Sequence, residues 1–449
     1  MIRVKNKKTH VFMLILLLIL GIGFAALAAT LKINGTITID SAKWDVHFEN
    51  VEVAQGSVTA TTVPTSDDAT TTEMTYAVDF TQPGDFYEFT VDIANDGTID
   101  AMVNLVTNKV YAADGETEKQ LPAYLSSTVT YVDGAPISKN QLLSKQTSEK
   151  IKVRVEFRSD VDASELPSTN ETTIFKFSST FKQADDTSCQ RPTTFENDSW
   201  DVIQCNVKNN PSSYPVGATK NIEMDIDGDN TNETYTLRVA NNTTPSECSQ
   251  EGFSQTACGF VIEFKDIIAR HRMNPSGDSN IEGYYAKGGW EYSDMRAYLN
   301  SKKYLNGEID YTNTGIYSIL PSDLKSKIID TIAVSGYGSE DTKNFITTDK
   351  LYLFSPHEIW EDVDGNTSSG LDYYDKSYSN TRQLDYYKAK GVTTSNYSEA
   401  KKIRVDNGSE YYWWLRSAYS SDFFFHVVGN FSFSSSPTNA GVSPAFRIG

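Results

Sequence analysis

The sequence is short of cations for its length. Its 449 residues contain 40 Lys and Arg against 59 Asp and Glu, so the formal net charge at pH 7 is -19. A protein that binds nucleic acid through charge needs a basic surface, and this balance excludes such a partner. Tryptophan is also scarce, at 6 residues, whereas 25 Tyr and 22 Phe favour β-rich structure over a helical bundle.

Familiar catalytic motifs are missing as well. The sequence contains no G-x-S-x-G, no H-E-x-x-H and no phosphate-binding glycine loop. None of the four cysteines belongs to a C-x-x-C pair, which disfavours a zinc site. We therefore predict a protein without catalytic residues, that is, not an enzyme.

The N-terminus carries the pattern of an export signal. Arg3, Lys5, Lys7 and Lys8 precede an uncharged apolar stretch at residues 11–29. A small-residue site at residues 26–28 allows cleavage, but the stretch is also close to the ~20 residues that span a bilayer. Residues 1–29 are thus a signal peptide or an N-terminal membrane anchor. The positive flank places the rest of the chain outside the cytoplasm, with this segment as its only membrane contact.

The cysteines fit this compartment. In an exported chain disulfides persist, and four cysteines allow three pairings. Sequential pairing closes the shortest loops and is the pairing that we expect, although spacing alone does not decide it. It would join Cys189 to Cys205 and Cys248 to Cys258.

The first half of the chain reads as short strands between turns. At residues 150–157 the apolar side chains Ile151, Val153, Val155 and Phe157 occupy every second position. This is the period of a strand with one buried face. Several such segments with little helix predict an antiparallel β-sandwich at residues 30–183.

The second half has a mixed pattern. Residues 292–301 and 321–330 are candidate helices, with strands elsewhere. The composition changes at residues 184–199, which we assign to a linker. Residues 200–449 would then form an α+β domain, which makes the whole chain mostly β with an α+β C-terminal half.

Residues 83–91 (PGDFYEFTV) and 95–101 (NDGTIDA) resemble the TasA and camelysin family of exported bacterial matrix proteins. The resemblance covers roughly residues 10–183 and includes the export segment that runs into the first strand. It implies a β-sandwich of a kind that in some members assembles into extracellular fibres. Self-association would use an edge strand completed by a neighbour's segment, and residues 31–40 are the natural donor.

The C-terminal half carries a second resemblance. The runs WWLRS at 413–417 and GVSPAFRI at 441–448 resemble an uncharacterised domain, a domain of unknown function, of Gram-positive surface proteins. That domain usually has Arg where this chain has Ser443. The same runs are similar to the C-type-lectin-like fold, which implies a lectin-like α+β domain but no function by itself.

One acidic motif suggests a metal. Four acidic residues occupy odd-numbered positions near Gly228. Their spacing resembles D-x-D-G-D-x-x-x-D calcium loops, and calcium prefers such oxygen ligands. The alternative is a polar hairpin turn, because Asp-Gly and Asn are also hairpin residues. The candidate calcium ligands are Asp225, Asp227, Asp229 and Glu233.

Hydroxyl-rich residues beside the WWLR strand form a candidate ligand surface for a glycan or a protein. They are Tyr419, Ser420, Ser421, Asp422 and Ser434. The strand itself reads as a core hairpin. His357 and Glu358 follow Ser355-Pro356, which favours the first turn of a helix over an acid–base pair.

These patterns predict an exported cell-surface or extracellular-matrix protein with an adhesin-like, non-enzymatic C-terminal module. A cell-wall or glycan hydrolase that uses a carboxylate pair is the first alternative. A purely structural matrix-fibre protein is the second.

Overall fold

A computed structural model describes residues 42–64, 72–167, 173–274, 287–301, 311–338, 341–363, 380–419, 422–428, 431–435 and 438–449. The chain divides into two compact units, Met1–Ala42 and Lys43–Gly449, and the description below concerns the second. The expected export segment (1–29) and donor strand (31–40) lie outside the described residues. Within the part of the chain that the structure describes, no helix has the length and hydrophobicity to cross a membrane.

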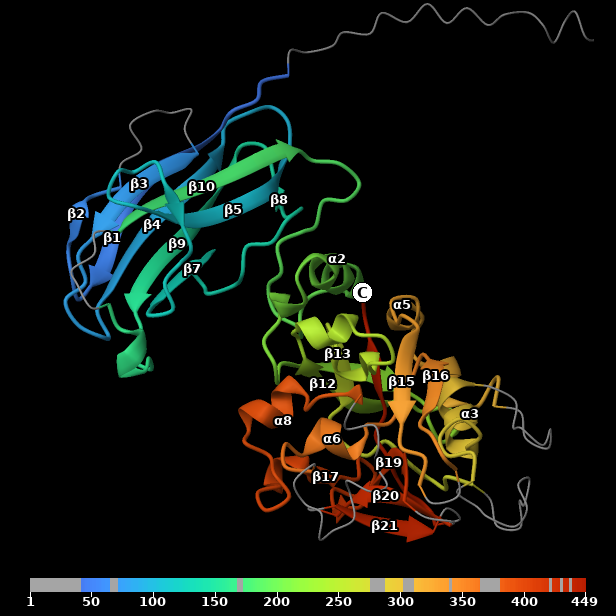
Figure 1. The fold of residues 1–449 in the computed structure, drawn as a ribbon. Helices are drawn as coiled ribbons and strands as arrows, with labels where there is room; N and C mark the ends of the chain where they lie inside the picture. Colours follow the sequence, from blue (N-terminus) through green and yellow to red (C-terminus); the bar gives the residue numbers. More distant parts are fainter. Residues whose placement is uncertain are drawn as a thin grey trace, which may run out of the picture. The chain divides into compact units, whose positions relative to one another are not determined.

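The N-terminal part contains two antiparallel sheets (Figure 1). The first contains, in spatial order, β1 (Val46–Gly56), β4 (Phe86–Asn95), β9 (Thr147–Phe157) and β7 (Leu125–Tyr131). The second contains β2 (Ala60–Thr62), β3 (Glu73–Val78), β10 (Ile174–Gln183), β5 (Ala101–Tyr111) and β6 (Glu118–Lys119), and β8 (Leu142–Leu143) also pairs with β5. A 3-10 turn, η1 (Ala163–Glu165), precedes β10.

The inner faces of these sheets form one core. Alternate residues of β9 are buried, as the period of two predicts, and Val153 lies opposite Phe89 of β4. Phe48 of β1 stacks on Phe177 of β10 with ring centroids 5.1 Å apart, so rings of the two sheets meet. The prediction of a mostly β chain with an N-terminal antiparallel sandwich is confirmed.

The C-terminal part is built on two larger sheets. The first contains β11 (Thr219–Met224), β12 (Glu233–Asn241), β13 (Val261–Phe264) and β23 (Ala445–Arg447), so the last strand of the chain pairs with an early one. The second contains β14 (Ala269–His271), β22 (Ala440–Val442), β19 (Trp413–Ala418), β20 (Phe423–Val427) and β21 (Phe431–Ser435). Two small pairs are β15 (Thr331–Ser335) with β16 (Phe345–Asp349) and β17 (Lys402–Ile403) with β18 (Glu410–Tyr411).

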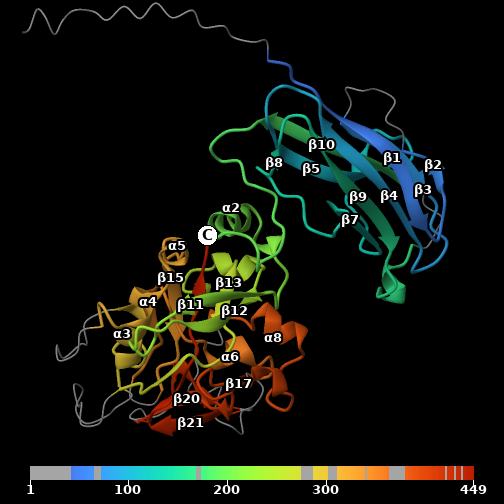
Figure 2. The ribbon, with the colours of Figure 1, turned by 180° about the vertical axis from the view of Figure 1, so that it is seen from behind.

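Short helices surround these sheets (Figure 2). The α-helices are α2 (Trp200–Asn209), α3 (Asp294–Asn300), α4 (Ile316–Ile319), α5 (Ser322–Lys325), α6 (Pro356–Ile359) and α8 (Asp385–Ala389). The 3-10 turns are η2 (Pro211–Ser213), η3 (Ser246–Ser249), η4 (Gln255–Ala257) and η7 (Ser398–Ala400). Within this part, α2 lies at one end and β20 with β21 at the other in both views.

One core joins the sheets and helices of this part. It includes the fully buried indoles of Trp290, Trp360, Trp413 and Trp414. The candidate helix at 292–301 is α3, whose first turn is capped by the Ser293 hydroxyl, which accepts from the Arg296 N–H at 3.1 Å. The strand order does not test a C-type-lectin-like fold, which stays a prediction, as do the domain boundaries at 184–199.

Candidate functional site

All four cysteines form disulfides in the sequential pairing. Cys189 is bonded to Cys205 and Cys248 to Cys258, with Cα–Cα distances of 5.6 and 5.9 Å. The first bond ties the segment before α2 to that helix, and the second closes the loop between β12 and β13. Such bonds are typical of proteins that fold outside the cytoplasm.

The predicted calcium loop is the turn between β11 and β12. Carboxylate oxygens of Asp225, Asp227 and Asp229 lie within 4.8 Å of one another. Asp225 accepts hydrogen bonds from the backbone N–H of Gly228 at 2.7 Å and of Asn230 at 2.9 Å, so it also holds the turn. Glu233 is outside this group of three, and its Oε2 accepts from the Tyr235 hydroxyl at 3.3 Å. Calcium binding stays a prediction.

A cavity of about 580 Å³ adjoins this turn, and we call it the hairpin groove. The β11–β12 hairpin, β14, α3 and the residues after β17 supply its walls. The lining residues are Ile226, Asp227, Glu233, Tyr235, Ile267, Ile268, Ala269, Arg270, Tyr298, Arg404, Val405, Asp406 and Asn439. Two of the four predicted calcium ligands, Asp227 and Glu233, thus face a cavity that the sequence did not indicate.

Charges of both signs line the hairpin groove. Asp227 and Asp406 are exposed and Glu233 is half-buried. Arg404 is held by Asp406, with Nε 2.9 Å from Oδ1 and a second bond from Nη2 to Oδ2. Arg270 is exposed and has no ion-pair partner among the described residues. Carboxylates and a guanidinium are therefore available to a ligand.

Tyr298 is one of the tyrosines that line the groove, and contacts with other rings hold it in place. Its ring stacks on His271 with centroids 4.2 Å apart and meets Tyr311 edge-on at 5.3 Å. The Tyr311 hydroxyl donates to Asp294 Oδ1 at 3.0 Å. Burial lowers the pKa of His271 to about 4 and raises the pKa of Tyr298 to about 12. Both rings are therefore uncharged at pH 7, and Tyr298 offers a rigid face.

Tyr419 and Asp422, the residues of the predicted hydroxyl-rich surface whose side chains the structure describes, do not line this groove. The Tyr419 ring packs against Phe425 at 5.2 Å, and its backbone N–H donates to the Phe423 carbonyl at 2.8 Å. Asp422 is half-buried and lies immediately before β20. Ser420 and Ser421 lie outside the described residues, and Ser434 is known only as the β21 partner of Phe424. The role of the predicted hydroxyl-rich surface in ligand binding stays a prediction.

The strand beside that surface belongs to the core, as its apolar sequence indicated. Arg416 of β19 and Glu358 of α6 are fully buried and joined by two bonds, from Nη1 to Oε2 at 2.7 Å and from Nη2 to Oε1 at 2.8 Å. Glu358 also accepts from the backbone N–H of Ser355 at 3.0 Å. Glu358 is thus a structural group, which agrees with the helix-start interpretation of residues 355–358.

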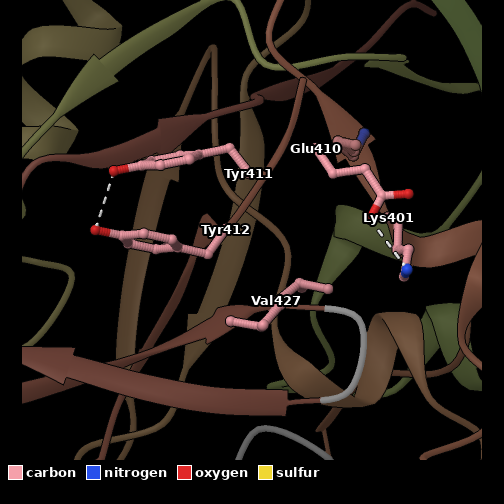
Figure 3. Close-up of a pocket in the computed structure, with 7 residues that line it drawn as sticks. Lys401, Glu410, Tyr411, Tyr412 and Val427 are labelled. Carbon is pink, nitrogen blue, oxygen red and sulfur yellow. Dashed lines mark hydrogen bonds and ion pairs between the residues drawn. The ribbon is translucent and has the colours of Figure 1, made fainter. Parts of the chain in front are cut away.

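A smaller depression of about 240 Å³ lies beside β18 (Figure 3). Tyr411 and Tyr412 stack with ring centroids 4.3 Å apart, and the Tyr411 hydroxyl donates to that of Tyr412 at 3.2 Å. Lys401 is paired with Glu410 at 3.0 Å. Burial, followed by the bond from Tyr411, raises the pKa of Tyr412 to about 12. The two hydroxyl groups bond to each other and Lys401 is paired with Glu410, so these groups are already engaged. The hairpin groove is therefore the better candidate site.

Sequence reasoning missed most of the groove. Arg270, Tyr298 and Arg404 come from segments far apart in the chain and share no motif. A bridge between Ile267 and Arg404 and the stacking of Tyr298 on His271 of β14 bring their segments together. Local spacing carries no signal for such long-range contacts.

The structure thus defines a mostly β protein with two disulfides and a polar, aromatic-walled groove. Residues 264–449 match the family model described as "Domain of unknown function (DUF6273)". The expectation of an uncharacterised C-terminal domain is confirmed for this range, which begins later than the predicted residue 200. Asp227, Glu233 and Tyr235 precede the matched range. No curated protein matches the chain.

Proposed function

We propose that this protein is an exported, non-enzymatic recognition protein of the cell surface or extracellular matrix, and that its hairpin groove binds a glycan. The observation that carries the proposal is the groove itself. Its volume of about 580 Å³ is in the range of ligand sites, and tyrosines, carboxylates and guanidiniums line it together.

A glycan suits this lining better than a protein segment does. The apolar C–H face of a sugar ring packs against a flat aromatic side chain such as Tyr298. Sugar hydroxyls accept from Arg270 and donate to Glu233, and bonds to charged partners are roughly twice as strong as neutral ones. Tyr298 is already held by His271 and Tyr311, so little ordering entropy opposes binding.

Export belongs to the same proposal. Two disulfides in the structure are consistent with folding outside the cytoplasm, and the N-terminal pattern supplies the signal or anchor. The proposal also includes three finer points. The sandwich is similar to the TasA and camelysin family, and the protein self-associates through residues 31–40. The C-terminal part has a C-type-lectin-like fold, as part of a Gram-positive surface protein.

A glycan array with the purified protein tests the proposal. Glu233→Gln and Arg270→Ala should each weaken binding by at least about tenfold, because each removes a charge-assisted hydrogen bond. Glu223→Gln is the matched control, since Glu223 lies on the same hairpin but does not line the groove. Absence of any glycan ligand, or equal affinity in the groove variants and the control, would reject the proposal.

A hydrolase is the second candidate, because Asp227, Glu233 and Asp406 all line the groove. Against it, Asp227 and Asp406 are exposed, whereas a general acid needs a desolvated carboxyl group. Release of reducing ends from cell-wall glycan by the wild type, lost in Glu233→Gln, would favour this candidate. Fibre formation without any binding would favour the purely structural alternative.

A further inference from the structure

Another cavity, of about 350 Å³, has a different charge from the rest of the molecule, and we call it the basic pocket. Three of its lining residues are cations and none is a carboxylate, although the chain carries a net charge of -19. The lining residues are Val216, Gly217, Thr219, Arg238, Lys265, Tyr386, Ala389 and Lys390.

Arg238 is the buried cation among the residues that line the basic pocket. Its side chain is 8% exposed, and its guanidinium lies 3.7 Å from the centroid of the Tyr386 ring. Nε and Nη2 donate to Glu263 Oε1 at 2.9 and 2.7 Å. No hydrogen bond of Nη1 occurs among the described residues. Among the described residues, one nitrogen of this nearly buried guanidinium is therefore left without a hydrogen bond.

The buried charges around Arg238 do not cancel. Glu263 is fully buried and also accepts from Lys402 Nζ at 2.6 Å and from the Tyr387 hydroxyl at 2.9 Å. Arg238 and Lys402, two cations, thus share one carboxylate. Because charges act more strongly in a low-dielectric interior than in water, the excess positive charge favours an anion above it.

Two lysines complete the walls of the basic pocket. Lys390 Nζ lies 5.9 Å from the Tyr386 ring centroid, on the side chain that also contacts Arg238. Lys265 and Lys390 are exposed, and neither has an ion-pair partner in the part of the chain that the structure describes. Glu399, which does not line the pocket, accepts from the Tyr386 hydroxyl at 2.9 Å.

We propose that the basic pocket binds an oxyanion, a carboxylate or phosphate group of a small ligand, through Lys265, Lys390 and Arg238 Nη1. Both groups present charged oxygens to ammonium and guanidinium donors. Arg238 is oriented by Glu263 and Tyr386, and the lysines supply mobile point charges. This site is separate from the hairpin groove and does not rest on the function proposed for it.

Calorimetric titration of the whole protein at low ionic strength tests the proposal, with inorganic phosphate and glucuronate as separate probes. The double variant Lys265→Gln/Lys390→Gln should raise the Kd by at least about tenfold, because it removes two charged donors. The control Lys388→Gln/Lys401→Gln changes the net charge equally outside the pocket and should change the Kd by less than about twofold.

Saturable binding of either probe that is lost in the pocket variant supports the site, and the probe that binds identifies the group. No saturable heat with either probe would overturn the proposal. An equal loss in the pocket and control variants would also overturn it, because it would indicate non-specific attraction. Glu233→Gln should leave the affinity for the anion unchanged, which separates this site from the hairpin groove.

Discussion

Arg416 and Glu358 form an ion pair that water does not reach. Besides its two bonds to Glu358, Arg416 donates from Nε to the Val334 carbonyl and from Nη1 to the Leu353 carbonyl, both at 2.8 Å. A buried guanidinium is costly unless it is satisfied in this way. The pair therefore holds β19 and α6 in one arrangement, and removing one partner should destabilise the fold.

Arg416→Met should reduce the free energy of unfolding by about 3 to 5 kcal/mol, because it leaves the buried Glu358 charge uncompensated. Urea denaturation measures the loss. Adding Glu358→Gln should recover part of it, since no buried charge then remains. Lys401→Met, which breaks the exposed pair with Glu410, should cost less than about 1 kcal/mol. Equal stability of Arg416→Met and the wild type would contradict the buried pair.

The burial of Lys402 makes the free energy of unfolding depend on pH in the alkaline range. Burial, partly offset by Glu263, lowers its pKa from 10.5 to about 8. Between these values the unfolded chain holds the proton and the folded protein releases it, so the free energy of unfolding rises with pH. The free-energy cost of burying the protonated Lys402 is fully present below pH 8 and disappears toward pH 10.5. Arg238 and Asp266 are the other charges that act on Lys402.

We expect the free energy of unfolding to increase from pH 8 to pH 10 by up to about 3 kcal/mol. Above pH 10 the effect ends, because burial holds the pKa of Tyr387 well above its ordinary value and ionisation of that tyrosine then favours the unfolded chain. Lys402→Met should abolish the increase while Glu263 stays paired with Arg238. Denaturation curves at several pH values check this, and a rise that persists in Lys402→Met would have another source.

Elements with a local signal were predictable, and elements that depend on distant partners were not. The alternation in β9 and the cap of α3 are determined by residues that are neighbours in the sequence. The candidate helix at 321–330, in contrast, ends early as α5 at Lys325. Ile328 instead bridges to Ile448, and the Ile329 N–H donates to the Arg447 carbonyl at 3.0 Å. That competing partner lies at the other end of the domain sequence.

The β11–β12 turn gives a test of metal binding. Three carboxylates so close together repel one another, and a calcium ion would relieve that repulsion. Millimolar calcium should therefore raise the Tm of the wild type, and Asp227→Asn should remove most of the increase. Asp186→Asn, at an exposed acid outside the turn, should respond like the wild type. An unchanged Tm with calcium would leave the turn with a structural role only.

The molecule as a whole combines an acidic surface charge, two disulfides and binding cavities of different charge. The hairpin groove presents carboxylates beside arginines, whereas the basic pocket presents cations alone. The residues of each cavity come from segments more than a hundred positions apart. Composition could therefore predict a mostly β chain, but only the folded chain brings each set of side chains together.

The compartment of the molecule is testable through its thiols. If the protein is exported, the natively purified protein should show no free thiol, and reduction under denaturing conditions should release all four. Cys189→Ala/Cys205→Ala should cost about 3 kcal/mol, the loop-closure entropy of a short cross-linked loop. Cell fractionation with a thiol-reactive mass label distinguishes the compartments. Full-length protein in the cytosol with its cysteines labelled would refute export, and the glycan-binding role at the cell surface would have to be abandoned with it.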